Sequence, residues 1–179
     1  MPWKNGKGTT TEIAVHPPGA GLAAFDWRVS MATVASDGPF SLFPDVDRTL
    51  SIIAGEGLML TVGDASPIRI VADSEPLSFP ADVPVDATLL NGGIEDLNVM
   101  TRRGRLSHRV ERLKVSGSSL HPPSNGTTLY LALGALRFKC GLQEGQLAPR
   151  DCLLCEAGDE PVTLSGSGSI VFRMDIDTA

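Results

Sequence analysis

The 179-residue sequence is poor in the features that mark secreted, disulfide-bonded or membrane-spanning proteins. It has three cysteines, an odd number that does not suit a disulfide framework and fits a reducing compartment. No apolar run approaches the roughly 18 residues that a membrane-spanning helix needs. The first residues lack the apolar core of a signal peptide. These absences predict a soluble, cytoplasmic protein with no membrane partner.

Positive charge is also scarce, because 15 Lys and Arg residues stand against 21 Asp and Glu residues, a net charge of −6. Binding to nucleic acid needs a basic surface, so a nucleic-acid partner is not expected. One basic segment stands out, residues 102–114, with six basic side chains and Glu111 alone opposing them. A solvated strand end is favoured for this segment over an anion-binding rim or a partner contact.

Metal ligands are few and badly spaced. The histidines at 16, 108 and 121 each stand alone, whereas two ligands on one face of a strand need a spacing of two. Cys152 and Cys155 have the spacing of half a zinc site, but only one other cysteine exists to complete it. We therefore interpret Cys152 and Cys155 as two core cysteines in a buried strand, and not as ligands of a zinc ion. The sequence therefore predicts no metal and no cofactor.

Short runs rich in Val, Ile, Leu, Thr and Phe recur along the chain, separated by Gly and Pro. No segment of 12 residues free of Gly and Pro shows helical spacing of its apolar residues. The pattern predicts an all-β protein built as a sandwich or barrel. Between two of the runs, Gly55-Glu56-Gly57 predicts a tight hairpin. The predicted strands are 27–34, 49–54, 58–62, 68–71, 77–79, 87–90, 96–100, 110–115, 128–133, 136–139, 152–155, 162–164 and 170–176.

A weak internal repeat is visible, because residues 52–60 can be laid on residues 130–138 with similar strand–turn–strand sequences after each. The repeat predicts two copies of a jelly-roll unit. The expected division is an N-terminal barrel over residues 1–115 and a smaller C-terminal half over 116–179, packed as one compact unit. Ser116-Gly117-Ser118-Ser119 is the expected linker.

Several polar residues stand where a strand protein usually has apolar ones. Arg28 lies inside a predicted strand, Arg48 opens another, and Asp96 and Asn98 share one face of a third because side chains alternate along a strand. Taken singly, each has a structural explanation: Arg28 turned outward, Arg48 paired with an aspartate just before it, Asn98 capping an irregular edge. Together they supply cations, an amide and a carboxylate without a metal, which suits recognition of a small anionic molecule.

At these residues the sequence resembles the HutD/Ves family of bacterial proteins. The similarity covers residues 1 to about 115 through ordered blocks, and the last third matches only as a pattern of strands. The blocks are MPWKNGKGTTTE (1–12), WRVS (27–30), DGPFSLFP (37–44), DRTL (47–50), GEGLML (55–60) and DLNVMTRRG (96–104).

The resemblance implies a metal-free bicupin, that is, two packed RmlC-like jelly-roll barrels without the cupin metal motif. It also implies a regulator of histidine utilisation that senses a small anionic intermediate, with N-formylglutamate the leading suggestion. We expect the ligand site in the N-terminal barrel. The expected ligand-binding residues are Lys4, Asn5, Thr10, Arg28, Arg48, Asp96 and Asn98.

In this hypothesis Lys4 and Arg28 or Arg48 pair with ligand carboxylates, and amide and hydroxyl groups hold the neutral atoms. The alternative is a metal-independent cupin-type enzyme, an isomerase, lyase or hydrolase acting on a small carboxylic acid. Asp96 or Glu12 is then the general base. A third hypothesis, a protein-contact module, predicts an interior filled by apolar side chains. A homodimer is expected through exposed sheet edges.

Overall fold

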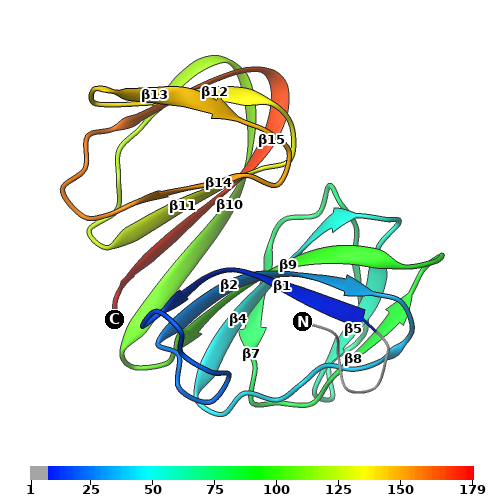
Figure 1. Cartoon of the computed structure of the whole chain (residues 1–179). Coiled ribbons are helices and arrows are strands. Elements are labelled where there is room, and N and C mark those ends of the chain that lie inside the picture. The colour runs from blue at the N-terminus through cyan, green and yellow to red at the C-terminus, as the bar shows by residue number, and fades with distance from the viewer. Residues whose placement is uncertain (1–7) are drawn as a thin grey trace. The chain divides into compact units, whose positions relative to one another are not determined.

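A computed structural model describes residues 8–179, and over that range the chain forms strands and no helix (Figure 1). The described part of the chain therefore holds no helix able to span a membrane. The chain divides into two compact units, Met1–Leu106 and Ser107–Ala179. The all-β prediction is confirmed, and each unit is described separately below.

Unit 1 is built from a five-stranded and a four-stranded antiparallel sheet (Figure 1). The larger sheet has the order β1-β2-β9-β4-β7, and the smaller has the order β3-β8-β5-β6. Apolar side chains of both sheets, among them Leu50, Ile52, Leu58 and Leu60, form one buried cluster. The strands are β1 (Gly8–His16), β2 (Trp27–Val34), β3 (Gly38–Pro39), β4 (Val46–Ala54), β5 (Leu58–Val62), β6 (Ile68–Ile70), β7 (Leu77–Pro80), β8 (Val85–Leu89) and β9 (Ile94–Arg102).

Unit 2 holds a six-stranded sheet in which β15 is long enough to pair with β12 through its first part and with β11 through its second. Its core contains Tyr130, Leu136, Val162 and Leu164, all buried. The strands are β10 (Leu106–His121), β11 (Thr127–Ala132), β12 (Leu136–Cys140), β13 (Gln143–Leu147), β14 (Cys152–Cys155) and β15 (Val162–Thr178).

Strand pairing follows the same scheme in both units. In unit 1, β4 pairs with β7 and β9, while β5 pairs with β6 and β8. In unit 2, β11 pairs with β14 and with the second part of β15, while β12 pairs with β13 and with the first part of β15. The segments aligned by the internal repeat therefore hold corresponding places in the two units.

Some local predictions need correction. Residues 162–164 and 170–176 belong to the single strand β15, and residues 116–119 continue strand β10. Gly55-Glu56-Gly57 does not close a hairpin, because β4 and β5 lie in different sheets. The turn instead carries the chain from one sheet to the other, with positive φ at Gly55 and Gly57.

Gly57 also permits a close backbone approach, and its replacement should therefore be costly. A Cβ atom at Gly57 would lie 2.2 Å from the Ile70 carbonyl oxygen, at a φ of +107°. Gly63 has a φ of +56° and open space around it. Gly63→Ala should lower the free energy of unfolding by about 1 kcal/mol, because of its backbone conformation alone. Gly57→Ala should lower it by about 1 to 3 kcal/mol more, because of the clash. Urea unfolding of both variants measures the difference, and equal losses would contradict it.

Candidate functional site: a buried polar cluster in unit 1

The register of the larger sheet gathers the polar residues on its inner face. On β9, alternation places Ile94, Asp96, Asn98 and Met100 on one side. Ile94 belongs to the apolar cluster between the sheets, and Met100 to a second apolar cluster at the other end of the strand. The two polar side chains between them therefore also face the interior, and both are buried.

The two neighbours of β9 each bring an arginine to this face. Met100 of β9 pairs with Arg28 of β2 on one side of the strand and with Arg48 of β4 on the other side. Asn98 is opposite Ser30 on β2. Residues that are remote in the sequence meet here because β9 is the central strand of the sheet.

The Arg48 guanidinium is held by a neutral amide and two aromatic rings. It is 8% exposed, and its Nε donates to Asn98 Oδ1 at 2.8 Å, with Nη2 donating to the same oxygen. Its Cζ lies 4.5 Å from the ring centroid of Phe40 and 5.7 Å from that of Phe79. Burial lowers the pKa of Arg48 to about 10, although the negative charge of Asp96 acts to raise it. The hydrogen bonds of this buried cation thus go to an amide of β9 and not to an aspartate just before it in the sequence.

Asp96 completes a chain of hydrogen bonds from this arginine. Asn98 Nδ2 donates to Asp96 Oδ1 at 2.6 Å, which fixes the orientation of the amide and aims its oxygen at Arg48. Asp96 is almost fully buried. Burial raises the pKa of Asp96 to about 6, although the Arg48 charge and the hydrogen bonds from Asn98 and the Ala32 backbone oppose the rise.

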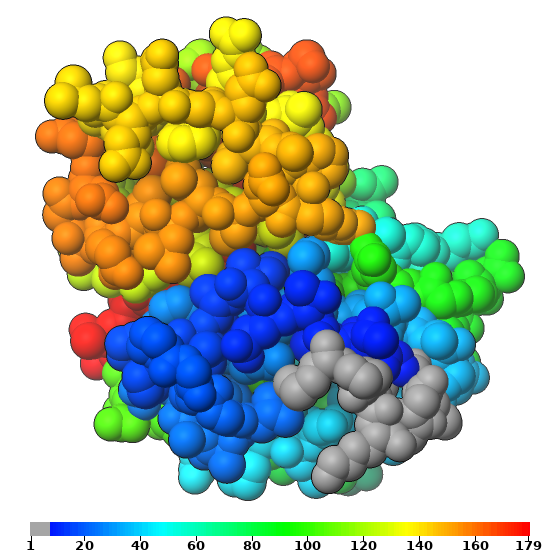
Figure 2. All heavy atoms as spheres, in the orientation of Figure 1, coloured from blue at the N-terminus to red at the C-terminus, as the bar shows by residue number. Residues whose placement is uncertain are grey.

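Arg28 has an unused hydrogen-bond donor. Its Nε donates to Glu12 Oε2 at 2.8 Å and its Nη1 to Ser30 Oγ at 3.1 Å. Its Nη2 is buried and has no hydrogen-bond partner among residues 8–179. Glu12 lies on β1 and is 39% exposed, and β1 runs along the surface of unit 1 (Figure 2, blue). A buried guanidinium N–H without a partner is costly, so this atom marks a place where an acceptor would bind favourably.

The structure brings together four of the residues expected from the sequence: Arg28, Arg48, Asp96 and Asn98. Thr10 lies on β1, opposite Ala32 of β2, and is half-buried. Lys4 and Asn5 lie outside the described residues. Two of the structural explanations considered for single residues are wrong. Arg28 is buried and is not turned outward, and Asn98 lies in the central strand and not at an edge.

Sequence reasoning missed Ser30, Phe40 and Phe79 as parts of the cluster. Ser30 could have been found, because it lies two residues after Arg28 on the same strand face. Phe40 lies between β3 and β4 and Phe79 lies on β7, so only the fold brings them to Arg48.

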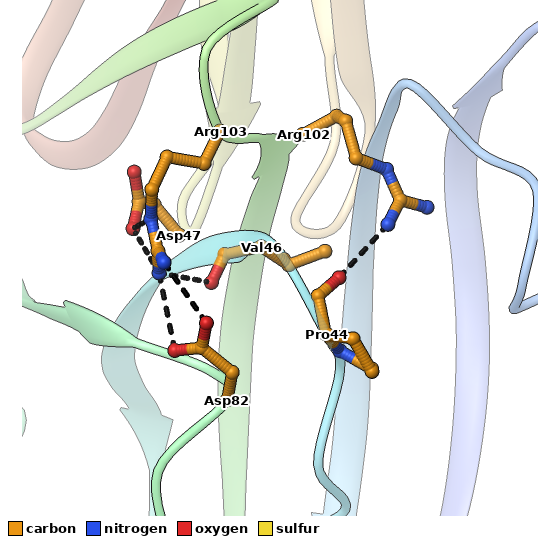
Figure 3. A network of polar contacts seen from close by, with 6 residues as sticks. All are labelled: Pro44, Val46, Asp47, Asp82, Arg102 and Arg103. Atoms are coloured by element: carbon orange, nitrogen blue, oxygen red, sulfur yellow. Dashed lines mark hydrogen bonds and ion pairs between the residues drawn. The ribbon is translucent and has the colours of Figure 1, made fainter.

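The first two arginines of the basic segment, Arg102 and Arg103, hold parts of unit 1 together (Figure 3). Arg103 pairs with Asp47 and Asp82, each at 2.9 Å, and its hydrogen bonds hold the pKa of Asp82 below its ordinary value. Arg102 donates to the Pro44 carbonyl oxygen at 2.9 Å. These bonds tie the start of β4, next to Arg48, to the end of β9.

Two of the three cysteines lie together in unit 2, where the side chains of Cys140 and Cys155 form a hydrogen bond. Cys140, Cys152 and Cys155 are free thiols, and Cys155 is buried in the core of unit 2. Within the described part of the chain, no three His, Cys, Asp or Glu side chains are placed to hold a metal ion.

The titration of Asp96 should make stability depend on pH. Because its pKa is about 6 in the folded chain and near 4 when unfolded, protons favour the folded state. The contribution of Asp96 to the free energy of unfolding should therefore fall by about 2 kcal/mol as pH rises from 4 to 6. Asp96→Asn should lack this fall, which urea unfolding at several pH values measures.

Asp82→Asn is the matched control, because the lowered pKa of Asp82 makes its contribution to stability depend on pH with the opposite sign. The wild-type advantage over this variant should be present at neutral pH and shrink on acidification. If Asp96→Asn and the wild type lose stability in parallel between pH 4 and 6, the assignment to Asp96 is wrong.

The two sheets of unit 1 and the corresponding pairings of unit 2 define an all-β protein with a cupin-like fold. In agreement, the structure matches a cupin 2 conserved barrel domain protein from Leptotrichia buccalis with a TM-score of 0.62. The match covers 100% of this chain and 92% of that one at 10% identity, so it speaks for the fold alone.

The chain belongs to the HutD family, whose model matches residues 1–172. It is 32% identical to an uncharacterized 21.2 kDa protein in the hutC 3′ region of Pseudomonas putida, over 94% of this chain and 87% of that protein. It is 30% identical to protein Ves of Cronobacter sakazakii, over 95% and 90%. A structure of HutD from Pseudomonas fluorescens, described as a formate condition, has a TM-score of 0.84 at 28% identity, covering 100% and 93%.

Proposed function

We propose that this chain is a cytoplasmic, metal-free bicupin that binds a small carboxylate and regulates histidine utilisation by sensing an intermediate such as N-formylglutamate. The observation that carries the proposal is the buried Nη2 of Arg28, which has no hydrogen-bond partner among residues 8–179. A carboxylate is the natural acceptor for such a group, because it pairs with guanidinium through charge-assisted hydrogen bonds. The HutD family membership supports the link to histidine utilisation.

The cluster has the chemistry that a dicarboxylate with a neutral polar group would require. Arg28 and Arg48 provide two cations from the strands on either side of β9. Ser30 and Asn98 provide neutral hydrogen-bonding groups between them. N-formylglutamate has two carboxylates and one formamide, which matches this set. Lys4, Asn5 and Thr10 complete the proposed ligand-binding residues.

The experiment that tests the proposal is a calorimetric titration of the metal-free protein with N-formylglutamate, with glutamate, formate and urocanate as comparisons. We expect saturable binding of N-formylglutamate, and NMR should show the same compound unchanged after incubation. Glutamate lacks the formyl group and should bind more weakly, since the polar groups that meet this group would lose a partner. No binding of any of the four compounds would overturn the proposal.

A second candidate function is a metal-independent cupin-type enzyme acting on a small carboxylic acid. One observation favours it: the buried carboxyl of Asp96 has a pKa of about 6, in the range that suits a general base near neutral pH. Turnover of N-formylglutamate in the NMR tube, lost in Asp96→Asn, would support the enzyme over the sensor. An unchanged spectrum in the presence of saturable binding would reject it for this compound.

A further inference from the structure

Resting on the proposed function, we propose that Asp96 couples ligand binding to proton uptake, so that the site takes up an anionic ligand together with a proton from solvent. The proposal concerns the regulation of the same site. It makes the affinity for a carboxylate increase as pH falls through the neutral range.

The geometry places Asp96 within the electrostatic reach of Arg48, to which it is joined through a neutral amide. Its carboxylate is linked to Arg48 of β4 through the Asn98 amide, with bonds of 2.6 Å and 2.8 Å. From β2 the charged group is Arg28, and from β1 it is Glu12, which is paired with Arg28. The other side chains opposite Asp96 in the sheet, Ala32 and Ile52, are apolar.

The charges of the cluster explain why an anion would bring a proton with it. Two guanidiniums and two ionised carboxylates sum to zero charge, and Lys4, which we also assign to the ligand, adds one positive charge. The two carboxylates of N-formylglutamate then leave the occupied site negative, and like charges in a desolvated site disfavour ionisation. The carboxylate that is easiest to neutralise then accepts a proton from water, and no bond other than the new O–H is formed.

Asp96 is the better proton acceptor of the two carboxylates. It is 1% exposed, whereas Glu12 is 39% exposed and forms a direct 2.8 Å ion pair. Burial has already raised the pKa of Asp96 to about 6, so a modest further rise carries it through neutrality. The protonated carboxyl retains a carbonyl oxygen that accepts the Asn98 amide, so the orientation of Asn98 toward Arg48 is preserved.

The sign of the pH dependence follows from linkage. If the complex binds more protons than the free protein, the binding constant rises with proton concentration. The dissociation constant should rise with increasing pH by up to about tenfold per unit, between the pKa of free Asp96 and its value in the complex. The carboxylates of N-formylglutamate remain ionised between pH 6 and 8, because ordinary carboxyl groups titrate near pH 4.

The test is a calorimetric titration of the full chain with N-formylglutamate at pH 7.0 in phosphate, HEPES and Tris, whose ionisation enthalpies differ. The slope of the observed enthalpy against buffer ionisation enthalpy gives the number of protons exchanged. We expect an uptake of about 0.5 to 1 proton for the wild type. Asp96→Asn should bind with a slope near zero, whatever its affinity. Asp82→Asn, which removes a carboxylate paired with Arg103 outside the cluster, should retain the uptake.

Binding with no proton uptake, or uptake that persists in Asp96→Asn, would overturn this inference and leave the proposed function standing. No binding by the wild type in any buffer would overturn the proposed function and this inference with it. If Asp96→Asn fails to fold or to bind, the wild-type dissociation constant between pH 6 and 8 decides. An increase with pH supports the coupling, and a constant value rejects it.

Discussion

Replacing Arg28 by alanine is expected to weaken N-formylglutamate binding by about 2 to 5 kcal/mol, or roughly 30-fold to several thousandfold. The substitution removes the unpartnered Nη2 that we assign to the ligand carboxylate. The fold should survive, because Glu12 is 39% exposed and its carboxylate can be hydrated once the ion pair is lost. Calorimetry measures the binding loss, and circular dichroism with thermal unfolding confirms that the variant is folded.

Arg105→Ala is the matched control for this prediction. Arg105 also forms a single ion pair, with Asp26 at 2.6 Å, but its side chain is 69% exposed and lies outside the cluster. Its loss should leave binding unchanged, since exposed ion pairs contribute little. Arg28→Lys should bind with intermediate affinity, because lysine keeps the charge but loses the planar fork of donors. Wild-type affinity in Arg28→Ala would remove Arg28 from the site.

The second large effect is expected at Arg48, where alanine should reduce the free energy of unfolding by about 3 to 5 kcal/mol. The substitution would remove the donor to Asn98, empty the space between the Phe40 and Phe79 rings, and leave Asp96 without a nearby buried cation. Urea unfolding near pH 7, where Asp96 is mostly ionised, measures the loss. Below pH 5 the loss of stability in Arg48→Ala should be smaller, because a protonated Asp96 has no charge for a cation to compensate.

Arg48→Met separates packing from hydrogen bonding in the same position. Methionine can fill much of the space between the two rings, so this variant should recover part of the stability that alanine loses. The unsatisfied Asn98 oxygen should still cost about 1 to 3 kcal/mol. If Arg48→Ala lost less than about 1 kcal/mol, the buried guanidinium would not hold the cluster together.

Local sequence patterns predict the strands best where apolar and β-branched residues are dense. Residues 27–34, 58–62 and 152–155 form strands over the same bounds as predicted. Strand β1 is not predicted, because Gly8–His16 opens with threonines and lies at the edge of its sheet. Strand β13, with the sequence QEGQL, carries almost no apolar signal. Short-range patterns describe a strand by its own residues and fail when pairing alone stabilises it.

Pairing partners are harder to predict than the strands themselves. The Gly55–Gly57 turn has the composition of a hairpin, yet the chain crosses between sheets there. The difference depends on hydrogen bonds from β4 to β7 and β9, which are remote in sequence. The positive φ values agree with the prediction, because glycine tolerates them in either kind of turn.

The candidate site is predictable in composition and only partly in arrangement. Alternation along a strand is enough to place Asp96 and Asn98 on one face. It does not tell whether that face points inward, nor that β9 lies between the strands of Arg28 and Arg48. The unpartnered Nη2 of Arg28 depends on the register of three strands, and such a property of the assembled sheet cannot be seen in the sequence.

Binding of a small carboxylate by the buried cluster of Arg28, Arg48, Asp96 and Asn98 can be observed directly in a crystal structure of the protein with N-formylglutamate. We expect a ligand carboxylate within hydrogen-bond distance, about 2.7 to 2.9 Å, of Arg28 Nη2. A second polar group of the ligand should lie close to Arg48 or Asn98. A ligand bound elsewhere in the chain, with Arg28 Nη2 still unpartnered, would contradict carboxylate binding at this cluster.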